Sequence, residues 1–207
     1  MICAGLDLGQ SVDHAALVIG RARARPLAVK IEYVRQFPLN TSYALIVAEV
    51  VKTLNLLPKD PITDDVSLAV DRRGPGGPVV DMLAATPGLN IKRLLAISST
   101  SASAARRQPP LPADPVFLER WFVPKQLLFR TLLGLINSGR FAVAEILGAD
   151  RLRTEFERFE FRLTERTYIM LDGHGCPDDI LLSVVMSCWA AITTKTEEES
   201  NEKWSLD

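Results

Sequence analysis

Four acidic residues at three places in the sequence stand beside almost wholly apolar segments. Asp7 and Asp71 each end an apolar run, and Asp178 and Asp179 precede another. A carboxylate at the end of a buried strand loses hydration energy unless another group compensates it. Hard divalent cations such as Mg²⁺ bind carboxylate oxygens and compensate several at once. Two such ions roughly 3.5–4 Å apart can activate a water and stabilise the leaving oxygen of a phosphodiester.

Each of these acids also has a structural explanation. Asp178 and Asp179 could complement the dipole of a helix that they begin. Asp71 precedes Gly74 and could be a turn residue. Asp13 follows Asp7 by six residues, and a turn aspartate is the simpler interpretation, with a role as an extra metal ligand as the alternative. The presence of all three acidic positions together favours the metal site.

The elements that must position these acids are predicted from the apolar spacing. Residues 2–8, 15–20 and 27–37 are expected to form an antiparallel three-strand meander. A helix capped by Thr41 or Ser42, a strand at 66–70, a short helix at 79–85 and a strand at 91–97 follow. This order is typical of parallel strands joined by crossovers, so the fold class is α/β.

The second half of the chain is expected to be more helical. Residues 98–115 have the composition of a loop, and Pro124 can begin a helix that ends near Gly139. Further predictions are a helix at 150–158, a hairpin at 159–171 and an apolar helix at 177–192. If Asp7 and Asp71 end neighbouring parallel strands, the last helix would bring its acid pair to them across 107 residues of sequence.

Composition and charge exclude several classes of protein. The 47% hydrophobic and 24% charged fractions are globular values, and no apolar stretch reaches the roughly 18 residues of a membrane span. The segment 195–207 holds five acids against two lysines, a net charge of −3, and is expected to be a disordered tail. The domain at 1–194 therefore carries +2. Three cysteines, with His174 beside Cys176, match no disulfide framework or zinc motif, so a reducing cytoplasm is expected.

The order of strands, helices and acids resembles the ribonuclease H-like fold, and more closely the nuclease domain of the phage large terminase, the DNA-packaging subunit. The resemblance spans residues 5–180. The sequence departs from that family in the spacing of His174 before the acid pair and in Arg72-Arg73 after the second acid. It also lacks the phosphate-loop motif of the family's ATPase. The segments that carry the resemblance are Gly5-Leu6-Asp7-Leu8-Gly9 with Asp13 and Ala16, Ala69-Val70-Asp71 with Gly74 to Asp81, Val123-Pro124-Lys125 with Leu127 and Leu128, and His174 to Ile180.

This resemblance implies a DNA endonuclease with a mixed sheet and flanking helices, in the cytoplasm of an infected or lysogenic bacterium. Its metal ligands, for two Mg²⁺ or Mn²⁺ ions, would be Asp7, Asp71, Asp178 and Asp179, with Asp13 as a further candidate. Expected partners are double-stranded DNA, a packaging ATPase, the portal and the small terminase subunit. The alternatives are a RuvC-like junction resolvase and a module of the same fold that has lost catalysis.

Basic residues near these acids are candidates for contacts with the DNA backbone. Lys125 begins a predicted helix, and Arg106 and Arg107 lie in the predicted loop before it. Such contacts fix a protein on DNA without reading its sequence. Because paired arginines are also common on solvated surfaces, the ordinary surface role stays an equal alternative.

Overall fold

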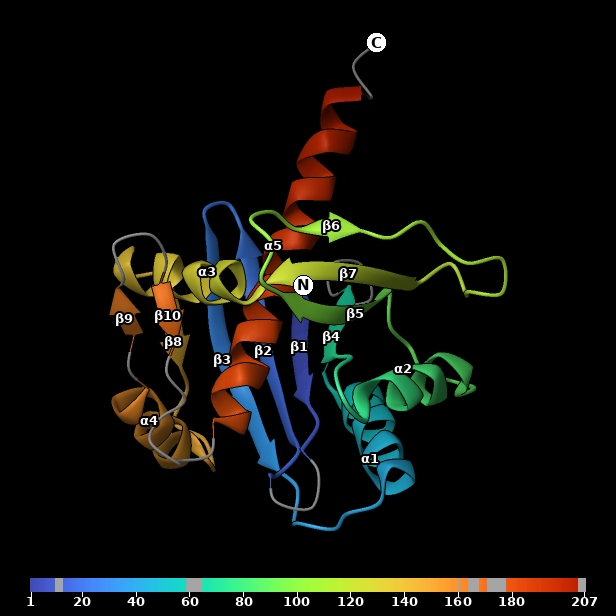
Figure 1. The fold of residues 1–207 in the computed structure, drawn as a ribbon, viewed down its shortest axis with the longest axis horizontal. Coiled ribbons are helices and arrows are strands. Elements are labelled where there is room, and N and C mark those ends of the chain that lie inside the picture. The colour runs from blue at the N-terminus through green and yellow to red at the C-terminus, as the bar shows by residue number, and fades with distance from the viewer. Residues whose placement is uncertain (10–12, 59–64, 160, 164–167, 171–177, 205–207) are drawn as a thin grey trace.

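The computed structural model describes residues 1–9, 13–58, 65–159, 161–163, 168–170 and 178–204, and Figure 1 shows their arrangement. Eight strands form one sheet in the order β6-β7-β5-β4-β1-β2-β3-β8, and β9 and β10 form a separate hairpin. The strands are β1 (Ile2–Asp7), β2 (Ala16–Ala24), β3 (Leu27–Gln36), β4 (Val66–Asp71), β5 (Arg93–Thr100), β6 (Arg106–Arg107), β7 (Leu118–Pro124), β8 (Phe141–Val143), β9 (Phe161–Leu163) and β10 (Tyr168–Met170). The helices are α1 (Tyr43–Leu56), α2 (Gly76–Ala85), α3 (Lys125–Asn137), α4 (Ala149–Arg158) and α5 (Asp179–Trp204).

The sheet is mixed, as predicted. Strands β1, β2 and β3 are antiparallel neighbours and form the expected meander. Strands β4, β5 and β7 run parallel to β1 on its other side. In the parallel register Leu6 pairs with Val70, so the next residues, Asp7 and Asp71, end adjacent strands side by side.

The alternation of side chains along β1 divides the core into two layers. Ile2, Ala4 and Leu6 are buried with the apolar faces of α1 and α2. Cys3 belongs to the layer on the opposite face, which α3 and α5 cover. Odd-numbered residues of β1 therefore face α5, and Asp7 is the last of them.

Helix α5 packs directly on β1 because the residues at the contact, Gly5 on the strand and Ser183 and Ser187 on the helix, are small. A Cβ on Gly5 would lie 1.9 Å from the carbonyl oxygen of Ser183, so only glycine fits at this contact. Ser187 Oγ donates a hydrogen bond to the Cys3 carbonyl oxygen at 3.0 Å. These contacts fix the position of the helix along the strand, and with it the position of Asp179.

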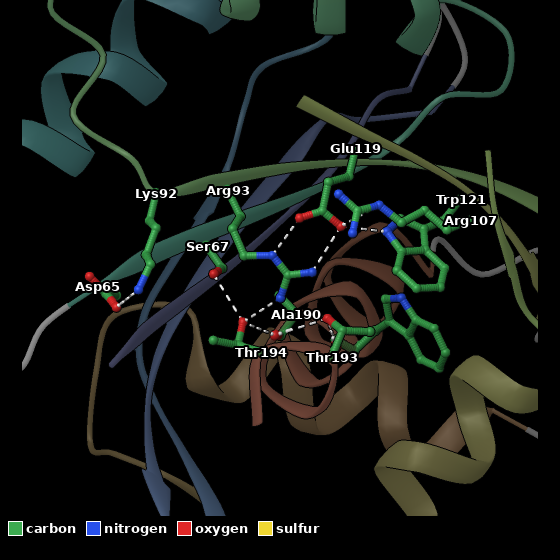
Figure 2. A network of polar contacts seen from close by, with 11 residues as sticks. Asp65, Ser67, Lys92, Arg93, Arg107, Glu119, Trp121, Ala190, Thr193 and Thr194 are labelled. Atoms are coloured by element: carbon green, nitrogen blue, oxygen red, sulfur yellow. Dashed lines mark hydrogen bonds and ion pairs between the residues drawn. The ribbon is translucent and has the colours of Figure 1, made fainter. Parts of the chain in front are cut away.

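Strand β7 is the main element that the apolar pattern of the sequence does not predict. Its residues Glu119 and Arg120 interrupt the apolar alternation, which is why no strand was expected there. Glu119 is nevertheless buried, because its carboxylate pairs with Arg93 at the start of β5 (Figure 2). Strand β6 lies within the predicted loop at 98–115, and β8 was also not predicted. The β9–β10 hairpin agrees with the hairpin predicted at 159–171.

Helix α5 is longer than predicted. The helix continues past Thr194 to Trp204, into the segment that the sequence predicts to be disordered. Glutamate and lysine favour helix, and adding turns to an existing helix needs no new nucleation. Figure 1 shows this end of α5 projecting beyond the rest of the molecule. No helix in the described ranges is long and apolar enough to cross a membrane.

Candidate active site

Strands β1 and β4 are neighbours in the middle of the sheet, and each places a carboxylate at its C-terminal end. Asp7 and Asp71 follow the paired residues Leu6 and Val70, and only 9% and 4% of their surfaces are exposed. Adjacent parallel strands lie about 4.8 Å apart. Burial raises the pKa of Asp7 well above its ordinary value, and the charges of Asp71, Asp179 and Asp178 raise it further. The four acids therefore lie close enough for their charges to act on Asp7.

Helix α5 brings Asp179 to the same point through a repeat of four residues. Asp179, Ser183 and Ser187 follow one another along one face of the helix, and the two serines contact β1. Ser183 Oγ accepts a hydrogen bond from the Asp7 backbone N–H at 3.1 Å. The same hydroxyl oxygen lies 2.8 Å from the Ala16 carbonyl and 2.9 Å from the Asp179 carbonyl. One serine thus ties together β1, β2 and the first turn of α5.

The structure distinguishes between the two acids of the pair. Asp179 is 3% exposed, and its Oδ2 atom has no hydrogen-bond partner among the described residues. Burial raises the pKa of Asp179 to about 6, with further contributions from the charges of Asp178 and Asp13. Asp178 is half-buried, and its backbone carbonyl accepts the first hydrogen bond of α5 from Leu182 at 2.8 Å. Asp179 is therefore the acid that needs a counter-ion.

Two residues beside the cluster come from the loop between β1 and β2. Asp13 is exposed, and its charge acts on Asp179, so this candidate ligand lies near the cluster. His14 lowers the pKa of Asp179 through its charge and through a backbone hydrogen bond. The His14 Nδ1 atom lies 2.8 Å from the Phe37 carbonyl oxygen, which fixes the ring. His174, Cys176 and Pro177 lie outside the described residues.

Sequence reasoning missed Glu155 on α4. Its Oε2 atom accepts a hydrogen bond from the Leu181 backbone N–H at 2.8 Å, in the first turn of α5. Burial raises the pKa of Glu155 to about 7, and the charges of Asp179 and Asp178 add to this. The residue satisfies helix N–H groups that otherwise have no intrahelical partner. Its sequence context is a charged amphipathic helix, so only the packing of α4 on α5 reveals its role.

Arg73 is the second residue whose role appears only in the structure. Its Nε and Nη2 atoms donate to Asp71 Oδ2 at 2.9 and 2.6 Å, and its backbone N–H donates to Oδ1 at 2.9 Å. In the sequence, Arg72-Arg73 stands out only as a departure from the terminase pattern after the second acid. In the fold, the guanidinium of Arg73 is the counter-ion of a predicted metal ligand.

The donor chemistry of this cluster fits a hard divalent cation. Asp179 Oδ2 has no hydrogen-bond partner among the described residues, and burial together with the charges of neighbouring carboxylates raises the pKa of both Asp7 and Asp179. However, no three His, Cys, Asp or Glu side chains within the described ranges form a group already arranged to hold a metal ion. The fold thus gathers the ligands without presenting a finished coordination shell.

The predicted DNA contacts lie at different distances from the acids along the sheet. Lys125 begins α3 directly after β7, whose C-terminal end lies on the same side of the sheet as the ends of the strands that carry Asp7 and Asp71. Arg106 and Arg107 lie on the edge strand β6 and are exposed. Arg106 stacks over the Phe122 ring at 5.2 Å, and Arg107 lies 3.5 Å from the Glu119 carboxylate. Strands β7 and β5 therefore separate the two arginines from the acidic cluster.

Comparison with solved structures identifies the fold. The nuclease of the large terminase from thermophilic phage G20c superposes with a TM-score of 0.55 at 17% identity, covering 90% of this chain and 80% of that chain. The large terminase nuclease domain of bacteriophage SPP1, solved with bound Mn, gives 0.54 at 14% identity, with 90% and 84% covered. The human cytomegalovirus terminase nuclease domain, Mn-soaked and inhibitor-bound, gives 0.54 at 13% identity, with 91% and 81% covered.

These matches show that the chain has the fold of terminase nuclease domains, as the resemblance in the sequence predicted. No protein-family model matches the sequence, and no curated protein matches it either. The likeness is therefore one of structure, and it covers nearly the whole chain.

Proposed function

We propose that this protein is a metal-dependent DNA endonuclease that cuts phosphodiester bonds with two Mg²⁺ or Mn²⁺ ions, as the nuclease part of a DNA-packaging terminase. The observation that carries the proposal is that Asp7, Asp71 and Asp179 lie near one another at the C-terminal ends of β1 and β4. One buried carboxylate oxygen there, Asp179 Oδ2, has no hydrogen-bond partner among the described residues. The solved neighbours are terminase nucleases, of which that of bacteriophage SPP1 was solved with bound Mn and that of human cytomegalovirus was soaked in Mn. Both findings support the same chemistry.

The residues of the acidic site have distinct roles in this proposal. The charges of Asp71, Asp179 and Asp178 all act on Asp7, and Asp7, Asp71 and Asp179 would be the carboxylates that hold the ions. Asp178 and Asp13 lie nearer to solvent and would bind through water or assist a second ion. Ser183 and Glu155 position the acids by fixing the first turn of α5. When bound, the two cations would activate a water and stabilise the leaving oxygen.

The proposed substrate is double-stranded DNA, held by its phosphates. Lys125 is the candidate nearest to the acidic residues, and Arg106 and Arg107 would contact DNA farther along the sheet. A net charge of only +2 on residues 1–194 supports weak binding without base recognition. In the cell, the proposed partners are a packaging ATPase, the portal and the small terminase subunit, which would hold the nuclease on its substrate.

Nicking of supercoiled plasmid tests the proposal. The protein is incubated with Mg²⁺, with Mn²⁺ and with EDTA, and the Asp179→Asn and Asp178→Asn variants are tested in parallel. Cleavage is expected with either metal and not with EDTA. Asp179→Asn should remove it, whereas Asp178→Asn should leave a measurable part. Cleavage in EDTA, or full activity of Asp179→Asn, would contradict the assigned site.

Two observations favour a second candidate, a DNA-binding or assembly module that keeps the fold without cleavage. Arg73 already neutralises Asp71, and the described acids form no finished metal group. The same assay separates this candidate, which binds plasmid but does not nick it at any metal concentration. A four-way junction included as a competing substrate tests the remaining alternative, because preferential cutting of the junction would indicate a resolvase.

A further inference from the structure

The guanidinium of Arg73 lies where a cation is needed. Three of its contacts with the Asp71 carboxylate measure between 2.6 and 3.2 Å, and both oxygens of that carboxylate are used. The Asp71 side chain is 6% exposed, whereas that of Arg73 is 50% exposed. The carboxylate is therefore inside the fold and its counter-ion is at the opening.

The charge of Arg73 acts on more than one acid. Its contact with Asp71 raises the pKa of the guanidinium, and the charges of Asp7 and Asp178 raise it further. One positive charge thus serves several carboxylates. It leaves Asp179 Oδ2 without a partner in the described part of the chain, so the acids remain incompletely neutralised.

The backbone that carries Arg73 is fixed, while its side chain has room to move. The N–H of Arg72 donates to the Ile97 carbonyl at 2.7 Å, which holds the turn against β5. A Cβ on Gly76 would lie 1.8 Å from the Asp71 carbonyl oxygen, so the start of α2 packs tightly under the same turn. The half-exposed guanidinium can leave Asp71 by rotation about its own bonds, without a change in this backbone.

We propose that Arg73 is a tethered counter-cation that stabilises the metal-free acidic cluster, competes with divalent metal for Asp71, and so sets the metal affinity of the site. This inference rests on the proposed function, because it takes Asp71 as a metal ligand. It explains why the acids converge and yet form no finished metal group among the described residues. Metal binding at Asp71 then requires the guanidinium to move toward solvent.

Titration with Mn²⁺ in the absence of DNA tests this inference, with the free ion followed by electron paramagnetic resonance. Arg73→Gln is expected to tighten Mn²⁺ binding roughly tenfold, because a nearby opposite charge shifts a carboxylate equilibrium by at least one decade. Arg72→Gln is the matched control, since it removes the same charge one residue away, where the charge acts on Asp114. The control should change the affinity less than threefold. Arg73→Lys keeps the charge and should lie between the wild type and Arg73→Gln.

Thermal melting in EDTA provides a second measurement that needs no metal. Arg73→Gln should melt roughly 2–4 °C below the Arg72→Gln control, because the acids lose their counter-ion. Addition of Mn²⁺ should then raise the melting temperature of Arg73→Gln more than that of the wild type. A variant that melts higher than the control in EDTA would overturn the stabilising role of Arg73.

The outcomes separate this inference from the function on which it rests. If Asp7→Asn weakens Mn²⁺ binding but Arg73→Gln does not tighten it, the inference is overturned and the proposed metal site is not. Equal tightening by Arg72→Gln and Arg73→Gln also overturns it, because a general charge effect would then be sufficient. Absence of Asp7-dependent Mn²⁺ binding in every variant overturns both the inference and the proposed metal site.

Discussion

The two ends of the buried part of α5 hold charged residues in opposite ways. Near Thr194, Arg93 donates to Glu119 at 2.6 and 2.9 Å and to Thr194 Oγ1 at 3.0 Å, and Trp121 Nε1 donates to Glu119 at 2.9 Å (Figure 2). Near Asp179, the half-exposed guanidinium of Arg73 pairs with Asp71, and the charges of Asp7 and Asp178 also act on it. Fifteen residues of helix, roughly 22 Å, separate the two regions. The first is balanced in charge and the second is not.

This difference indicates which region is structural and which is chemical. Arg93 and Glu119 are both 6% exposed, and each has the other as its compensating charge. Burial raises the pKa of Glu119, but the contacts with Arg93, Trp121 and Arg107 together outweigh it, so the net pKa is lowered. The pKa values of Asp7, Asp179 and Glu155 are all raised. A fold that retains uncompensated acids has kept them at a cost in stability, as functional sites do.

The largest difference between the regions should appear in cleavage. Asp7→Asn is expected to lower plasmid nicking at least about a thousandfold, since a bound cation contributes several kcal/mol to such a reaction. The same variant should melt at an equal or higher temperature than the wild type in EDTA, because it relieves repulsion among the acids. Activity and melting are measured on one preparation. A large fall in melting temperature would show instead that Asp7 is a structural residue.

The balanced region should respond in the opposite direction. Glu119→Gln leaves Arg93 buried without its charge partner, so we expect a loss of about 3–5 kcal/mol in the free energy of unfolding. Urea denaturation, compared with Asp7→Asn, measures the contrast between the two ends of α5. A cost below about 1 kcal/mol would mean that the Arg93 charge is solvated in solution and that the two regions are alike.

The dependence of stability on pH should come from the acidic region. The folded-state pKa values of Asp179 and Glu155 rise from 3.8 and 4.5 to about 6 and about 7, so the folded protein keeps protons that the unfolded chain has released. This contribution to stability is complete below about pH 4 and is lost as the pH rises through 6 and 7. Melting in EDTA should therefore fall between pH 5 and pH 8.

Glu155→Gln serves as the control for that pH profile. It should reduce the fall between pH 6 and pH 8, because it removes the group with the higher pKa. Mg²⁺ should also flatten the profile by compensating the ionised acids. An increase in stability from pH 5 to pH 8 without metal would contradict the raised pKa values.

The smallest expected effects concern DNA. Binding of duplex to the cleavage-deficient Asp71→Asn protein should be weak and steeply dependent on salt, and Ca²⁺ should strengthen it by neutralising the acids. Combined substitution of Arg106, Arg107 and Lys125 by alanine should weaken binding further and reduce the salt slope by about one per lost phosphate contact. Binding that ignores salt, or that survives the triple substitution unchanged, would exclude these residues as contacts.

The individual substitutions sharpen the comparison of the two regions. Lys125→Ala changes a residue on the same side of the sheet as the acidic residues and should mainly weaken DNA binding. Arg107→Ala removes an ion pair with Glu119 and should mainly lower stability, by about 1 kcal/mol or less for so exposed a side chain. Filter binding and melting on both variants would show whether the two effects separate.

Much of the acidic region could be predicted because strand ends carry a clear signal. Apolar runs that end in Asp7 and Asp71 indicate buried strands with a carboxylate at the edge, and the order of elements makes those strands parallel. The apolar stretch after Asp179 indicates a buried helix. Local patterns were sufficient here because each acid lies at the end of its own element.

The remainder depended on contacts between distant residues. Glu119 is a charged residue on a strand, and only its pairing with Arg93 explains why β7 is buried. Glu155 is acidic on a helix rich in charge, and only the packing of α4 on α5 gives it a role. The contact of Arg73 with Asp71 spans two residues, but the turn geometry that creates it has no recognisable sequence pattern.

The most direct test of the central claim is an anomalous difference map from crystals of the protein soaked in Mn²⁺. The account predicts at least one Mn²⁺ peak within coordination distance of carboxylate oxygens of Asp7, Asp71 and Asp179, with the Arg73 guanidinium displaced from Asp71. The same soak of Asp7→Asn crystals should give a weaker peak or none. A wild-type map without a peak at these carboxylates, at Mn²⁺ concentrations that support plasmid nicking, would contradict the account.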